Sequence, residues 1–153
     1  MANTYSQIYL HIIFSTKGRQ HRIPPEHQDT LHRFIIGIIN NRKAKAYAVN
    51  SMPDHVHILL SVAPDVTVSD IVRDIKAGAS KFINDNKWVP YEFHWQKGYG
   101  VFSCSQSTVD AVIKYIANQA EHHKKQSFQE EYLEFLKRYG IEFDMKYVFD
   151  DAE

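Results

Sequence analysis

The stretch that decides the fold reads Met52-Pro53-Asp54-His55-Val56-His57-Ile58-Leu59-Leu60-Ser61-Val62. Its apolar residues fall on alternate positions and predict one buried face of a β-strand: Val56, Ile58, Leu60 and Val62. The chain enters this strand through a Pro-Asp turn. A strand of this kind is typical of a sheet that packs against helices.

Two histidines, His55 and His57, fall on the other face of the same strand. They are two residues apart, which separates them by about 7 Å along the strand. Because a strand fixes the direction of both rings, the pair is able to bind one metal ion. Two hydrogen-bonded histidines on a half-exposed strand would have the same spacing, so a metal site requires a third partner.

Residues 107–123 offer that partner on a predicted helix. Ser107 and Asp110 have the spacing of a capping box, which predicts a helix start. Apolar residues then recur at helical spacing and predict a buried stripe: Val109, Val112, Ile113, Ile116 and Ala120. Tyr115 and Gln119 are four residues apart and share a face beside that stripe. Opposite the two histidines, Gln119 would give an oxygen as third metal ligand, and Tyr115 would be a nucleophile.

The segments His55-Val56-His57 and Tyr115-Ile116-Ala117-Asn118-Gln119 together resemble the HUH-type single-tyrosine transposases of the insertion-sequence 200/605 family. Trp95-Gln96-Lys97-Gly98-Tyr99-Gly100 and residues 115–149 resemble that family too, so the resemblance covers nearly the whole chain. It implies a DNA transposase with Tyr115 as the catalytic residue. It also implies His55, His57 and Gln119 as ligands of Mg²⁺ or Mn²⁺.

The resemblance further implies a substrate and an assembly. The substrate would be single-stranded DNA that carries hairpins near the element ends, cleaved through a covalent 5′-phosphotyrosine. The assembly would be a homodimer in which Tyr115 of one subunit can serve the histidine pair of the other. A free tyrosine has a pKa near 10, so Tyr115 needs activation by the metal or by a base such as His122. Two alternatives stay open: an enzyme that only nicks repeat hairpins, and a non-catalytic DNA-binding descendant.

The remaining patterns predict the element order β-α-β-β-α-β-α-α. Strands are expected over residues 7–16, 44–51 and 99–105 as well as in the quoted stretch. Helices are expected over about 26–42, 67–84, 107–123 and 127–140, with further capping boxes at Thr67/Asp70 and Ser127/Glu130. This order predicts one α/β domain over residues 1–153, with a ferredoxin-like antiparallel sheet covered by helices.

Composition limits the class of protein. The 44% hydrophobic content of the 153 residues fits one packed domain rather than a disordered chain. The single cysteine, Cys104, excludes an internal disulfide and fits a reducing cytoplasm. No signal peptide or membrane-spanning run is recognised, so we expect a cytoplasmic protein without membrane contact. Walker and dinucleotide motifs are missing from the sequence, so we expect no nucleotide cofactor.

Charge is unevenly distributed along the chain. The formal net charge is zero, which alone does not favour a nucleic-acid-binding protein. Residues 129–153 hold eight acids and three bases, which leaves 15 bases and 10 acids, a net of +5, in the first 128 residues. A mildly basic body is compatible with phosphate binding, although solvated surface charges would look the same. The candidate DNA contacts are Lys17, Arg19, Arg22, Arg73, Lys76 and Lys81.

Overall fold

The computed structural model describes residues 3–18 and 22–149. Its sheet is antiparallel and has the strand order β2-β3-β1-β4. The strands are β1 (Tyr9–Ser15), β2 (Ala44–Met52), β3 (His55–Val62) and β4 (Gly100–Cys104). Strand order and connectivity are those of a ferredoxin-like fold, which confirms the predicted fold class.

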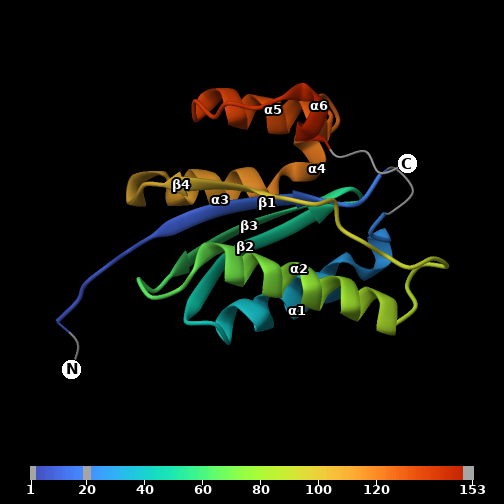
Figure 1. The fold of residues 1–153 in the computed structure, drawn as a ribbon, viewed down its shortest axis with the longest axis horizontal. Helices are drawn as coiled ribbons and strands as arrows, with labels where there is room; N and C mark the ends of the chain where they lie inside the picture. The colour runs from blue at the N-terminus through green and yellow to red at the C-terminus, as the bar shows by residue number, and fades with distance from the viewer. Residues whose placement is uncertain (1–2, 19–21, 150–153) are drawn as a thin grey trace.

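Helices cover both faces of this sheet (Figure 1). On one face lie α1 (Gln28–Asn40), which follows the short turn η1 (Pro25–His27), and α2 (Val68–Asp85). On the other face lie α3 (Val109–Ala117), α4 (Gln119–His122), α5 (Phe128–Arg138) and α6 (Met145–Val148). None of the described helices is long and apolar enough to cross a membrane.

Strand β3 separates the apolar core from the face that carries the two histidines. Val56, Ile58 and Leu60 belong to the main core, which α1 and α2 close. His55 and His57 point to the opposite face and are fully buried there. Because β3 pairs with β1 on one side and β2 on the other, its backbone is held along both edges. The direction of both histidines is therefore set by the centre of the sheet.

One of the three predicted capping boxes forms. In α5, Glu130 N donates to Ser127 Oγ, and Ser127 N donates to the Glu130 carboxylate. The other two predictions were wrong. Thr67 precedes α2 without a side-chain cap, and Asp70 accepts a hydrogen bond from Arg73 instead. Residues 106–108 form the 3-10 turn η2, in which the Ser107 hydroxyl contacts Ser105, so α3 begins later than predicted.

The predicted helix over residues 107–123 is broken at Asn118. Asn118 has φ −95° and ψ 20° and separates α3 from α4. Asn50 on β2 donates to the Ile116 carbonyl at 2.7 Å, which satisfies a carbonyl at the end of α3. The break turns Gln119 inward, where it is fully buried, and leaves Ala120 exposed. The predicted burial of Ala120 was therefore wrong.

Candidate active site

The imidazole rings of β3 are each held by a partner on the outer ring nitrogen. His55 Nδ1 lies 2.7 Å from Asp54 Oδ1, and His57 Nδ1 lies 2.8 Å from His11 Nε2 on β1. Both Nε2 atoms consequently face the space below α4 and α5. Metal-binding histidines usually have this arrangement, in which an outer hydrogen bond fixes the tautomer and aims the inner nitrogen.

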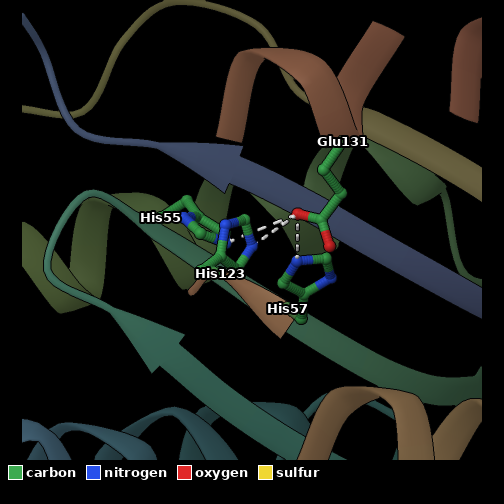
Figure 2. Close-up of side chains that lie close together, drawn as sticks. All are labelled: His55, His57, His123 and Glu131. Carbon is green, nitrogen blue, oxygen red and sulfur yellow. Dashed lines mark hydrogen bonds and ion pairs between the residues drawn. The ribbon is translucent and has the colours of Figure 1, made fainter. Parts of the chain in front are cut away.

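Figure 2 shows two further side chains, His123 and Glu131, which converge on the same space. Glu131 Oε1 lies 3.1 Å from His57 Nε2, 3.1 Å from His123 Nε2 and 3.6 Å from His55 Nε2. One donor atom from each of the four residues lies within 4.8 Å of the others. We call these four residues, His55, His57, His123 and Glu131, the histidine–glutamate cluster.

These distances fit a shell of ligands around one ion. With metal–ligand bonds of about 2.1 Å, neighbouring octahedral ligands lie ~3.0 Å apart and opposite ligands ~4.2 Å apart. His123 also has the expected outer partner, because its Nδ1 lies 2.7 Å from the Gln126 carbonyl oxygen. The chemistry of the donor set, three imidazoles and a carboxylate, therefore suits a divalent metal.

Gln119 reaches the position where the sequence predicted a third ligand. Its Oε1 lies 3.1 Å from His55 Nε2, and its Nε2 donates to Glu131 Oε2 at 3.1 Å. The side chain is fully buried. Its carbonyl oxygen thus faces the histidines, while its role as a metal ligand stays a prediction.

Tyr115 lies at the edge of the cluster. Its hydroxyl donates to Glu131 Oε2 and lies 3.3 Å from His122 Nε2. The centroid of its ring is 5.9 Å from that of His57. Tyr115 also lines a surface pocket with Asn118, Glu121, His122, Lys125 and Gln126. Tyr115 therefore lies between the buried cluster and a pocket that opens to solvent, and all of these residues belong to the same chain.

Burial and charge set the protonation of the cluster. Burial lowers the pKa of His57 to about 4 and that of His11 to about 3, so both rings are neutral and able to act as ligands or acceptors. Burial alone would raise the pKa of Glu131, but hydrogen bonds from His123, His57 and Tyr115 hold it well below its usual range. Burial, and then the Glu131 carboxylate, raise the pKa of Tyr115 well above its usual value. Tyr115 is thus protonated and lies beside the Glu131 carboxylate anion.

The predicted DNA contacts on α2 are not brought to this site. Arg73, Lys76 and Lys81 lie on the helix that covers the opposite face of the sheet (Figure 1). Arg73 pairs with Asp70 and Asp74, and Lys81 pairs with Asp85. Lys76 Nζ donates to the backbone carbonyls of Gln96 and Gly98. Their predicted role in DNA binding therefore lacks support from their position.

Of the remaining candidate DNA contacts, Arg22 lies closer to the cluster. Arg22 and Gly18 line a cavity of about 60 Å³ together with Asp54, the partner of His55, and Phe128. The ring of Phe128 stacks on that of His55, with 4.5 Å between centroids. Lys17 follows the bridge residue Thr16, and its backbone donates to the His94 carbonyl. Arg19 lies outside the described residues.

Three residues of the site were missed from the sequence: His11, His123 and Glu131. Glu131 carried a usable signal, because it lies three residues after Phe128 and four before Phe135, on the apolar face of α5. An acid at a buried helical position needs a partner. His11 lies on the face of β1 opposite to the core residues Leu10 and Ile12, and this alternation indicates its face but not its partner.

Comparison with known proteins gives the family. The family model described as "Transposase IS200 like" matches residues 4–119, which include both β3 histidines, Tyr115 and Gln119. The ISDra2 transposase TnpA of Deinococcus radiodurans is 26% identical over 120 residues, covering 74% of this chain and 84% of that protein. The transposase for insertion sequence element IS200 of Salmonella typhimurium is 24% identical over 130 residues, covering 81% and 84%.

Solved structures share the fold. A Deinococcus radiodurans R1 protein, provisionally described as a transposase, matches with a TM-score of 0.62 and 25% identity over 78% of this chain and 95% of that chain. A REP-associated tyrosine transposase bound to a REP hairpin matches with a TM-score of 0.59 and 16% identity over 80% and 73%. Since the family model covers more than half of the sequence, this chain belongs to the IS200-like transposase family.

Proposed function

We propose that the protein is a metal-dependent transposase that cleaves and rejoins single-stranded DNA through a covalent 5′-phosphotyrosine at Tyr115. The observation that carries this proposal is that the Tyr115 phenol and several imidazoles all contact the carboxylate of Glu131. The Tyr115 hydroxyl donates to Glu131, and the other oxygen of Glu131 faces His57. A candidate nucleophile and a set of candidate metal ligands therefore lie side by side, in a member of a transposase family.

His55, His57 and Gln119 would hold a divalent ion such as Mg²⁺ or Mn²⁺. When bound, such an ion polarises a non-bridging phosphate oxygen and offsets the negative charge of the phosphodiester. The protein contributes the direction of the ligands: Asp54 and His11 hold the outer nitrogens of the two β3 rings. The burial of both rings excludes bulk water from the ligand side.

In the proposed cleavage step, the Tyr115 oxygen attacks phosphorus and a bond forms between them. The bond from phosphorus to the 3′ oxygen breaks, and its electron pair leaves with that oxygen, which takes up a proton as a 3′-hydroxyl. The phenol gives its proton to a neighbouring acceptor, and His122 Nε2 at 3.3 Å and Glu131 are both within reach. The energy of the broken bond is kept in the phosphotyrosine, so rejoining to another 3′-hydroxyl needs no ATP.

We propose hairpin-bearing single-stranded DNA as the partner. A protein of similar fold binds a REP hairpin, which supports this class of substrate. The cavity lined by Arg22 beside Asp54 offers a cation near the histidines for a backbone phosphate. The same chemistry would serve an enzyme that nicks repeat hairpins without mobilising itself. Paired hairpins in the DNA on both sides of the gene would favour the mobile element.

We also propose that the protein forms a two-fold homodimer. Exposed large apolar side chains gather in the C-terminal segment: Tyr139, Ile141, Phe143, Met145 and Tyr147. Val148 and Phe149, in the same segment, pack against the core cluster of Phe128 and Phe135 instead. A surface of this kind favours association. Sedimentation showing a fully active monomer at micromolar concentration would exclude the dimer.

The decisive experiment removes one oxygen. Tyr115→Phe keeps the ring and should keep fold and DNA binding, but should abolish the protein–DNA adduct that survives boiling in detergent. The substrate is a single-stranded oligonucleotide made from DNA flanking the gene, supplied with Mn²⁺. Tyr139→Phe is the control, because the Tyr139 hydroxyl donates to the Ser103 carbonyl, and it should retain the adduct. An adduct in Tyr115→Phe would assign another nucleophile, and cutting by the wild type without an adduct would assign water.

A further inference from the structure

Glu131 presents its two oxygens to two different parts of the site. Oε1 faces the imidazoles of His55, His57 and His123 (Figure 2). Oε2 accepts hydrogen bonds from the Tyr115 hydroxyl and from the Gln119 amide. A single side chain of α5 therefore connects the candidate metal ligands with the candidate nucleophile.

The surroundings of Glu131 call for a cation. The residue is 1% exposed, and burying a carboxylate anion is costly unless the charge is compensated. In residues 3–18 and 22–149, its ion pairs are all with histidines: His55, His57, His122 and His123. A divalent ion among these rings would compensate the negative charge of the Glu131 carboxylate.

The geometry fits ligation by Oε1. Its distances of 3.1, 3.1 and 3.6 Å to three Nε2 atoms match the ~3.0 Å between neighbouring ligands of one ion. We infer that Glu131 is a ligand of the divalent metal and at the same time the acceptor that orients the Tyr115 hydroxyl. This inference rests on the proposed function and adds one residue of α5 to the proposed active site.

Gln119 depends on the same carboxylate. The Gln119 Nε2 group donates to Glu131 Oε2, and this bond turns the Gln119 carbonyl oxygen toward His55. Substitution of Glu131 would thus remove one candidate ligand and also the hydrogen bond that orients a second, Gln119. Glu131 lies beyond residue 119, where the match to the family model ends, so the family motif does not include it.

Mn²⁺ binding tests the inference without requiring activity. The metal-free protein is titrated with Mn²⁺ and followed by calorimetry and by the electron paramagnetic resonance of free Mn²⁺. Glu131→Gln should weaken binding by about 10- to 100-fold. The matched control is Glu134→Gln, an exposed acid one turn further along α5, which should bind as the wild type does. Affinity of Glu131→Gln within twofold of the wild type would overturn the ligand assignment.

A second measurement needs no variant. A crystal structure of the wild-type protein with Mn²⁺, located by its anomalous scattering, should have Glu131 Oε1 within bonding distance, about 2.2 Å. An ion held by His55 and His57 with Glu131 Oε1 beyond hydrogen-bond distance would overturn the assignment. This measurement remains decisive where Glu131→Gln fails to fold.

The orientation of Tyr115 is tested separately, at saturating Mn²⁺ for each protein. Under these conditions Glu131→Gln should form the covalent adduct on the order of tenfold more slowly or worse, because the hydroxyl loses its fixed direction. An adduct rate equal to that of the wild type would overturn the orienting role. If the wild type itself forms no adduct, the proposed function fails, and Mn²⁺ binding still decides whether Glu131 is a ligand.

Discussion

His11 Nε2 and His57 Nδ1 share a hydrogen bond of 2.8 Å between two adjacent strands of the sheet. A histidine that binds a cation through Nε2 carries its remaining proton on Nδ1. In the metal-bound protein, His57 Nδ1–H would therefore donate to His11 Nε2, which must be an acceptor. In that state His11 would hold both the tautomer and the direction of His57, although it is not itself placed to bind the ion.

Replacing His11 by phenylalanine should weaken metal binding. His11→Phe keeps a ring in the same space and removes the acceptor for His57 Nδ1. We expect Mn²⁺ affinity to fall by about 10- to 100-fold, measured by calorimetry. His32→Phe is the matched control, because His32 lies on α1, which covers the other face of the sheet, and its ring hydrogen-bonds to Ser51. Equal affinities in all three proteins would show that His57 needs no outer partner.

The metal-free protein should lose stability in mild acid. In the folded protein the pKa of His57 is lowered to about 4 and that of His11 to about 3, whereas an unfolded histidine titrates near 6.5. Between these values the unfolded chain binds protons that the folded chain does not. The free energy of unfolding should therefore fall as pH falls from 6.5 to 4, by up to about 1.4 kcal/mol per pH unit for each ring.

Urea unfolding at a series of pH values measures this dependence. His123 has the opposite sign, because Glu131 raises its pKa despite burial, so its contribution is complete below pH 6.5 and is lost as pH rises above that. His11→Phe should reduce the slope between pH 4 and 6.5 by about half. A slope that is unchanged in the variant would mean that His11 is not buried as a neutral ring.

The donor set predicts a preference among metals. Three imidazole nitrogens suit Mn²⁺ better than Mg²⁺, which prefers oxygen ligands and keeps its water. At equal concentration, Mn²⁺ should raise the melting temperature more than Mg²⁺ does, because tighter binding to the folded state stabilises it more. Equal stabilisation by the two ions would indicate binding through oxygen atoms alone.

Removing a predicted ligand should separate cleavage from binding. His55→Ala should abolish cleavage of hairpin DNA and leave hairpin affinity largely unchanged, because phosphate and stacking contacts carry affinity. Gln119→Ala should have the same effect less completely, since water can fill one coordination position. Cleavage and a gel-shift assay measure the two properties. Undiminished Mg²⁺-dependent cleavage by His55→Ala would exclude His55 as a ligand.

The single capping box that forms gives a stability prediction. Ser127→Ala removes the acceptor for Glu130 N at the start of α5 and should lower the free energy of unfolding by about 1 kcal/mol. Ser107→Ala is the control, because Ser107 had the same sequence signal but forms no cap. Comparable losses from the two substitutions would mean that the hydrogen bond to Ser127 contributes nothing of its own.

Local patterns predicted the sheet and much of the candidate site. Alternation along β3 predicted which face is core and which carries His55 and His57, because a strand has a strict period of two. Helical spacing predicted that Tyr115 and Gln119 lie on one side, and both do contact Glu131, although the break at Asn118 places them on separate helices. The four residues do come together in space, while the chemical role of each stays a prediction.

Contacts between distant segments could not be predicted in this way. At the break before Asn118, the Ile116 carbonyl accepts a hydrogen bond from Asn50, which lies 66 residues earlier in the chain. Glu131 meets His57 across 74 residues, and His11 meets His57 across 46. No local period encodes such pairings, which arise only from the packing of α5 and β1 against β3.

The candidate site draws on residues from position 11 to position 131, with its parts supplied by β1, β3, α3, α4 and α5 (Figure 1). This distribution has a consequence during protein synthesis. A chain still attached to the ribosome, with residue 131 inside the exit tunnel, holds the histidine pair and the tyrosine but lacks the carboxylate between them. DNA cleavage would then reach its full rate only after α5 has emerged and docked against β3.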